Sequence, residues 1–126
     1  MAGRCGDRIR VGRRGEELAA AYLMDAGHIV LARNWRAGHL EIDIVTMAGD
    51  GIHFVEVKSR IFPTEAEPEE YVSPAKQRKL AAAAVRWMTQ NGQTDAEACF
   101  DVVSVVFKGE TYELKYFPDA FIPVFM

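Results

Sequence analysis

Two alternating segments joined by a turn signal constrain the fold of this chain more than any other feature. Residues 40–46 and 52–59 alternate between apolar and polar or charged side chains, and the stretch MAGDG lies between them. A period of two is typical of strands that bury one face, and Gly-Asp-Gly is typical of a tight turn. The sequence therefore predicts a β-hairpin.

The predicted hairpin gathers charged side chains onto one face. Because side chains alternate along a strand, Glu41 and Asp43 share a face, and so do Glu56 and Lys58. A two-residue turn at residues 49–50 places Asp43 opposite Glu56, with Cβ atoms about 4.5 to 5.5 Å apart, and Glu41 opposite Lys58. The apolar face of the first strand is predicted to hold Leu40, Ile42 and Ile44.

Two interpretations of this charged face are open. Facing carboxylates at Asp43 and Glu56 repel each other unless a proton, a cationic side chain or a metal ion such as Mg²⁺ lies between them. Lys58 would then orient or deprotonate a water molecule, or stabilise charge on a phosphate. The alternative is a solvent-exposed face with a Glu41–Lys58 ion pair, and spacing alone favours it.

The remaining pattern predicts a single α/β domain over residues 1–126 with a mixed sheet of about five strands flanked by helices, in the order α-β-β-β-α-β-β. The other elements are a helix over 13–26, a strand over 28–33, a helix over 75–90, and strands over 100–107 and 112–116. The second helix is predicted to be a crossover between strands. We expect residues 1–12 to form a flexible basic arm, and the apolar tail 117–126 to dock on the domain or meet a partner chain.

Composition excludes several classes of function. The net charge of −3 weighs against a simple nucleic-acid coating protein but allows a nuclease. No apolar run would span a membrane and no secretory signal is evident, so we expect a cytoplasmic protein without a membrane partner. Cys5 and Cys99 lack a CxxC spacing and a His partner, which argues against a zinc ribbon, a disulfide scaffold and a thiol nucleophile, and Cys99 is expected in the core. The three histidines show no ligand spacing.

Several blocks of the sequence resemble one protein family. EIDIV followed by FVEVKSR resembles the core of the PD-(D/E)XK nuclease superfamily, which has a restriction-endonuclease-like fold. GRRGEELAAAYL, RNWRAGHLEID, PEEYVSPAKQRKL and CFDVVSV together resemble the YraN-like family of Holliday-junction-resolvase-like bacterial proteins. The four blocks stand in the same order and cover most of the chain.

This resemblance implies a metal site and a catalytic lysine. Asp43 and Glu56 would be the metal carboxylates, the Val57 carbonyl a further ligand, and Lys58 the catalytic residue. Glu16, on the first helix, would complete the metal shell.

Some of these assignments have alternatives from the sequence. Glu16 is equally typical of a glutamate in the first turn of a helix, where the helix dipole stabilises its negative charge. Glu17 would take its place in the metal shell if the helix turns a different set of residues toward the site. Asp101 is expected to have a structural role or to support the site. Trp35 is expected to be a core residue, and stacking on a nucleic-acid base is the alternative. The predicted substrate-binding residues are Lys76, Gln77, Arg36 and Arg60, although a solvated face is as good an interpretation for Lys76 and Gln77.

The function that follows is a Mg²⁺- or Mn²⁺-dependent endonuclease that hydrolyses DNA phosphodiesters, on branched or repair intermediates. A nucleic-acid-binding module without turnover and an interaction protein that pairs through the apolar tail are the alternatives. Because a four-way junction is cut at two symmetric positions, a homodimer is also compatible with the resemblance.

Overall fold

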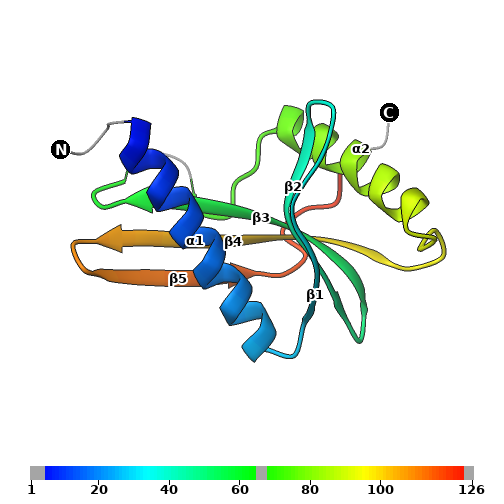
Figure 1. Ribbon diagram of the computed structural model, residues 1–126, viewed down its shortest axis with the longest axis horizontal. Coiled ribbons are helices and arrows are strands. Elements are labelled where there is room, and N and C mark those ends of the chain that lie inside the picture. The colour runs from blue at the N-terminus through cyan, green and yellow to red at the C-terminus, as the bar shows by residue number, and fades with distance from the viewer. Residues whose placement is uncertain (1–4, 65–67, 124–126) are drawn as a thin grey trace.

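The computed structural model describes residues 5–64 and 68–123, which form two helices and five strands (Figure 1). Their order, α-β-β-β-α-β-β, confirms the prediction. The elements are α1 (Cys5–Asp25), β1 (Ile29–Ala37), β2 (Leu40–Ala48), β3 (Gly51–Ile61), α2 (Pro74–Gln90), β4 (Ala98–Lys108) and β5 (Thr111–Phe117).

The five strands form one mixed sheet in the order β1-β2-β3-β4-β5. Neighbouring strands are antiparallel except β3 and β4, which are parallel from Ile52↔Ala98 to Ile61↔Phe107. A parallel pair needs a long connection, and α2 supplies it, as predicted. The β2–β3 hairpin turns at residues 49–50, because Ala48 pairs with Gly51 and Met47 with Ile52, which is the predicted register.

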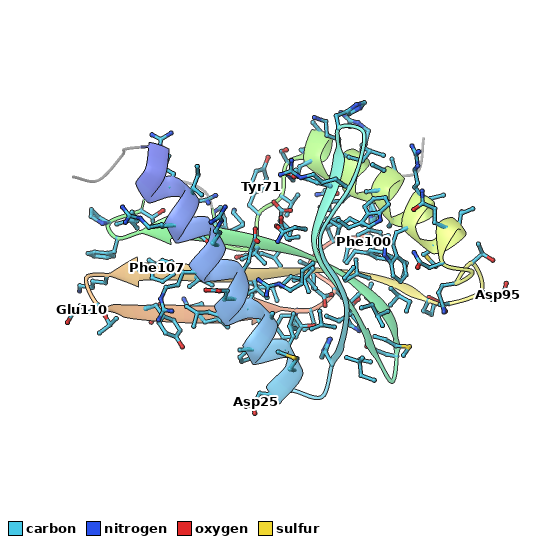
Figure 2. All side chains as sticks on the ribbon, viewed as in Figure 1. Asp25, Tyr71, Asp95, Phe100, Phe107 and Glu110 are labelled. Atoms are coloured by element: carbon cyan, nitrogen blue, oxygen red, sulfur yellow. The ribbon has the colours of Figure 1, made fainter. Side chains whose placement is uncertain are left out.

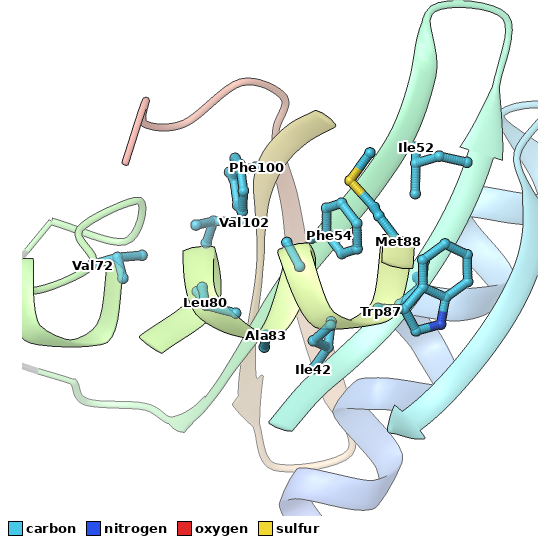
Figure 3. Close-up of a cluster of buried hydrophobic side chains, with 12 residues drawn as sticks. Ile42, Ile52, Phe54, Val72, Leu80, Ala83, Trp87, Met88, Phe100 and Val102 are labelled. Atoms are coloured by element: carbon cyan, nitrogen blue, oxygen red, sulfur yellow. The ribbon is translucent and has the colours of Figure 1, made fainter. Parts of the chain in front are cut away.

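The two helices cover opposite faces of the sheet. In Figure 1, α1 lies across β3, β4 and β5, where its side chains pack with those of all three strands and of β2. This core contains Ala19, Ala20, Leu23, Ile44, Val55, Val103 and Val105. A larger cluster lies under α2 (Figure 3) and contains Ile42, Val45, Ile52, Phe54, Val72, Leu80, Ala83, Ala84, Trp87, Met88, Phe100 and Val102.

The ends of the chain differ from the prediction in one respect. Helix α1 begins at Cys5, so the prediction of a flexible arm is wrong for residues 5–12, while 1–4 lie outside the described residues. The Arg-rich segment continues the helix because arginine is a good helix former. The tail docks on the domain as far as Pro123: the Ala120 amide donates to the Phe100 carbonyl at 2.8 Å, and the Phe121 ring lies 5.5 Å from that of Phe100.

Within the described residues, neither helix has the length and apolar character that crossing a membrane requires.

Gly15 sets how closely α1 approaches β3. A Cβ atom at Gly15 would lie 1.9 Å from the Ser59 Oγ and 3.0 Å from the Ser59 Cβ, whereas one at Gly12 would meet nothing within 4 Å. Ser59 follows Lys58 on β3 and Glu16 follows Gly15 on α1. The absent side chain at Gly15 therefore brings the helix against the part of the sheet that carries the predicted site.

We expect Gly15→Ala to lower the free energy of unfolding by about 1 to 3 kcal/mol, because the helix must move away from Ser59. The matched variant Gly12→Ala should raise it by roughly 0.5 to 1 kcal/mol, because alanine is the better helix former and nothing obstructs it. Urea unfolding of both variants checks the difference. Equal stabilisation by both substitutions would contradict the close approach.

Candidate functional site

The candidate site lies where β2 and β3 stop pairing. The antiparallel register runs from Ala48↔Gly51 to Ile44↔Val55, one step short of Asp43 and Glu56. Beyond that step the Val57 amide donates to the Asp43 Oδ2 at 2.8 Å, so a side chain accepts the hydrogen bond in the place of a strand carbonyl. An unpaired buried amide is costly, and this bond satisfies it.

The alternation of β2 side chains between the two faces of the sheet changes at Asp43. Ile44 packs in the cluster under α1, whereas Ile42 packs in the cluster under α2. The prediction that these two isoleucines share a face is therefore wrong. The strand twists at Asp43, because its carboxylate turns toward the β3 backbone instead of continuing the ladder.

The structure brings the Asp43 and Glu56 carboxyl groups together through a side-chain hydrogen bond. Burial, and next the charge of Asp43, raise the pKa of Glu56 from 4.5 to about 7. Burial also raises the pKa of Asp43, although the Val57 amide and Lys76 oppose that rise. Of the two carboxyl groups, Glu56 is therefore the one that holds a proton more readily near neutral pH.

Lys58 lies on the same face of β3 as Glu56, and the residue is only 9% exposed. Its Nζ donates to the carbonyl of Tyr71 at 2.8 Å, and Tyr71 lies in the segment before α2 (Figure 2). The ion pair that the structure shows for Glu41 is with Arg36, at 3.4 Å. The interpretation of a solvent-exposed face with a Glu41–Lys58 ion pair is therefore wrong for Lys58, because residues before α2 cover it.

A carboxylate of the acidic loop helps to hold this cover in place. Glu69 accepts from the Ser104 Oγ and from the Lys115 Nζ, both at 2.9 Å. These bonds fasten the loop to β4 and β5 beside Lys58. Sequence reasoning missed Glu69 and the Tyr71 carbonyl, and the only signal was the block PEEYVSPAKQRKL, in which neither residue had an assigned role.

The amino end of α2 forms one wall of the site. Ser73 caps the helix by accepting from the Lys76 amide, and the Lys76 Nζ lies 3.7 Å from the Glu56 Oε2. A cavity of about 300 Å³ lies here, lined by Glu56, Val57, Lys58, Arg60, Tyr71, Val72, Ser73 and Lys76. The Gln77 amide instead donates to the Val72 carbonyl at 2.9 Å.

Glu16 lies near the pair but does not complete a cluster of three. Burial, and then the charge of Asp43, raise the pKa of Glu16, which also makes a side-chain hydrogen bond with Asn34. Among the described residues, Glu16, Asp43 and Glu56 do not form a group whose oxygens all lie within 4.8 Å of one another. Glu17 is exposed on the surface of α1.

Each of the other predicted residues makes contacts within the protein. Arg60 is exposed and donates to its neighbour's carbonyl, the Ser59 oxygen, at 3.1 Å. Trp35 packs against the core under α2, as its structural interpretation predicted. Asp101 is fully buried, and its contacts are on the α1 side of the sheet, with His53, Tyr116 and the Asp119 amide.

The environment of Cys99 differs from the prediction. Cys99 is partly exposed, not a core residue, and pairs in register with His53 across β3 and β4. The prediction that this cysteine lacks a His neighbour is therefore wrong. Burial, and then the charge of Asp119, raise the pKa of the Cys99 thiol to about 11, so the thiol is not activated as a nucleophile.

The fold and site together define a mixed α/β protein with two coupled carboxyl groups and a lysine on one face of its central sheet. The chain belongs to Uncharacterised protein family UPF0102, whose model matches residues 15–105. This confirms the resemblance to the YraN-like family, and the architecture is consistent with the PD-(D/E)XK superfamily.

Relatives in several bacteria, each described as a UPF0102 protein, are similar over most of this chain. The protein from Oleidesulfovibrio alaskensis is 44% identical over 112 residues, which cover 89% of this chain but 55% of that relative. The protein from Anaeromyxobacter dehalogenans is 42% identical, covering 95% of this chain and 90% of the relative. The protein from Rhodococcus jostii is 37% identical, covering 90% and 97%.

We expect Glu56→Gln to raise the free energy of unfolding at pH 8 by about 1 to 3 kcal/mol, because it removes a carboxylate whose side chain is only 17% exposed. The folded pKa of about 7 lies above the ordinary 4.5, so the folded wild type binds a proton that the unfolded chain has lost. Wild-type stability therefore increases as the pH falls from 7 to 4.5, and the advantage of the variant disappears over that window. Denaturant unfolding between pH 4 and 8 measures it.

The control for this experiment is Glu17→Gln, which removes the same charge from the exposed surface of α1. Its difference from the wild type should stay within about 0.5 kcal/mol and should not follow this pH dependence. A Glu56→Gln variant that is no more stable than the wild type at pH 8 would show that the ionised Glu56 carboxylate does not destabilise the folded protein.

Proposed function

We propose that this protein is a divalent-metal-dependent endonuclease that hydrolyses DNA phosphodiesters. The observation that carries the proposal is the pair of coupled carboxyl groups, Asp43 and Glu56, with Lys58 on the same face and a cationic cavity beside it. The family resemblance supports the same reaction, because it implies that these three residues are the metal carboxylates and the catalytic lysine of the superfamily.

The donor set of this pair suits Mg²⁺ or Mn²⁺. Both ions prefer carboxylate oxygens, and they commonly take one or two carboxylates together with water and phosphate oxygens. The raised pKa of Glu56 favours a proton on this carboxyl group, which reduces the repulsion of two buried charges. A cation held by the same two side chains removes that repulsion without the proton, and it would supply an activated water and neutralise charge on the phosphate.

The residues of the chain prepare this position before any substrate binds. The Val57 amide fixes the direction of the Asp43 carboxylate. The Val57 carbonyl is assigned as a further ligand by the resemblance alone. Glu16 approaches from α1, on the opposite side of the sheet from α2, and belongs to the proposal as a carboxylate that acts through water.

Lys58 is the proposed catalytic lysine. The Tyr71 carbonyl accepts one hydrogen bond from its ammonium group and so limits the positions that the group can adopt. Its low exposure strengthens its electrostatic effect on a nearby phosphate, because little water screens it. Lys58 would therefore stabilise the negative charge that develops during hydrolysis.

The cavity beside the pair has the charge that a phosphate backbone requires. Lys58, Arg60 and Lys76 line it, and so does Ser73, the residue that caps the amino end of α2. Helix amino ends and lysine or arginine side chains both attract phosphates. We therefore assign this cavity, and not the Arg36–Glu41 ion pair, as the position of the scissile phosphate group.

We expect Lys58→Met to lower the rate of DNA cleavage in Mn²⁺ by at least about 100-fold while the affinity for DNA changes by less than about threefold. The methionine keeps the apolar stem and removes the charge. Cleavage of linear, single-stranded and four-way DNA, with binding measured in Ca²⁺, checks both parts. Lys79→Met, on the exposed face of α2, should leave both quantities unchanged.

A wild-type protein that binds all three DNA forms and cuts none of them would contradict the enzyme proposal and favour a binding module without turnover. A protein that binds none of them would contradict both. Thermal unfolding of each variant identifies any loss of activity that is caused by loss of the fold.

We expect Arg60→Gln to weaken DNA binding and to lower the slope of log affinity against log salt by roughly 0.7 to 0.9, as loss of one phosphate contact does. Arg86→Gln removes the same charge from the other end of α2, away from the cavity, and should leave the slope unchanged. Fluorescence anisotropy over a series of salt concentrations measures both. Equal slopes in the two variants would exclude this cavity as the phosphate position.

A further inference from the structure

A second polar cluster lies on the face of the sheet opposite the carboxyl pair. His53 of β3 and Cys99 of β4 are partners in the parallel register, so their side chains point to the same side. Asp50 reaches them from the β2–β3 turn, and its Oδ1 lies 2.7 Å from the His53 Nε2. One carboxylate oxygen, one ring nitrogen and the sulfur all lie within 4.8 Å of one another.

A hydrogen bond on the side of the ring away from Asp50 fixes the orientation of the His53 imidazole. Its Nδ1 lies 2.6 Å from the Oδ2 of Asp101, a carboxylate that is fully buried. The Tyr116 hydroxyl donates to the same oxygen at 2.5 Å, and the Asp119 amide donates to the Oδ1 at 2.9 Å. A carboxylate behind a histidine in this way directs the other ring nitrogen outward and makes it a better metal ligand.

We propose that Asp50, His53 and Cys99 bind a zinc ion, with Asp101 as the positioning residue behind His53. This site is separate from the proposed nuclease centre and does not depend on it. The set of one thiolate, one imidazole and one carboxylate is typical of Zn²⁺, whereas Mg²⁺ prefers oxygen ligands alone. The two faces of the sheet would therefore take different metals.

The geometry needs only a small adjustment to hold the ion. Tetrahedral zinc with a sulfur at about 2.3 Å and nitrogen or oxygen at about 2.0 Å keeps its ligand atoms roughly 3.2 to 3.8 Å apart. Side-chain rotation of Asp50, which is 64% exposed on a turn, and of Cys99, which is partly exposed, closes the remaining separation. The ion displaces the proton that His53 now shares with Asp50 and the proton of the thiol.

An ion at this position would link parts of the chain that are distant in sequence. Asp50 belongs to the hairpin turn, His53 to β3, and Cys99 to the beginning of β4 after the α2 crossover. A ligand that binds only the folded state stabilises it. Zinc would therefore hold β4 in its parallel register with β3.

Titration with Co²⁺ in a Cys5→Ser background tests the proposal, because thiolate ligation gives cobalt a near-ultraviolet charge-transfer band. We expect one equivalent of Co²⁺ to produce the band, zinc to displace it, and the further change Cys99→Ser to abolish it. Asp50→Asn should weaken Co²⁺ binding by at least about tenfold. His39→Ala, at an exposed turn, and Asp43→Asn should leave the band unchanged.

Thermal unfolding gives a second measurement on the same proteins. Zinc should raise the melting temperature of the Cys5→Ser protein and leave that of the Cys5→Ser, Cys99→Ser protein unchanged. Absence of the band, or an equal band with and without Cys99, would overturn the proposal. If the Cys99 variant does not fold, Asp50→Asn decides, since this residue lies on an exposed turn and equal affinity there also overturns the site.

Discussion

The hydrogen bond from the Val57 amide to the Asp43 carboxylate determines how the rest of the candidate site is built. It forms where the β2–β3 register ends, and it takes the place of a strand-to-strand bond. Protonation of Asp43 would weaken that bond, so the carboxylate remains the acceptor of a buried amide that would otherwise lose about 1 to 3 kcal/mol. The proton of the coupled pair is consequently held by Glu56, whose pKa is raised to about 7.

Three acidic side chains and two lysines surround this hydrogen bond. Asp43 and Glu56 bring negative charge into a region that is largely closed to water, and Glu16 is partly buried beside them. Desolvation is the first cause of the raised pKa of each. Lys76 offsets part of this charge at 3.7 Å from Glu56, while Lys58 is directed to the Tyr71 carbonyl. This excess of negative charge is expected at a site that is completed by a cation, because the ion stabilises the ionised pair that the protein alone destabilises.

Much of this arrangement could be predicted from the sequence, because it depends on short-range rules. The turn at residues 49–50 and the period of two were enough to set the hairpin register as far as Ile44↔Val55, one step short of Asp43 and Glu56. The end of that register was not predictable, since it depends on the carboxylate of Asp43 bonding to backbone fourteen residues away and on the twist that moves Ile42 to the other core.

The contacts that the sequence did not reveal are those made across long connections. Burial of Lys58 depends on residues before α2 that lie over β3, and the charged loop sequence resembled an ordinary solvated segment. His53 and Cys99 become neighbours only through the parallel pairing of β3 with β4, after an intervening helix. Local spacing contains no information on that register, which is why neither residue had a predicted partner.

The most direct test of the account is the anomalous density of crystals soaked with Mn²⁺ at a pH above 7, where Glu56 loses its proton. A metal site at this pair should give one strong peak within coordination distance of an Asp43 oxygen and a Glu56 oxygen, and no peak there in crystals of Asp43→Asn. Carboxyl groups that remain hydrogen-bonded to each other without a metal peak, in Mn²⁺ at that pH, would contradict it.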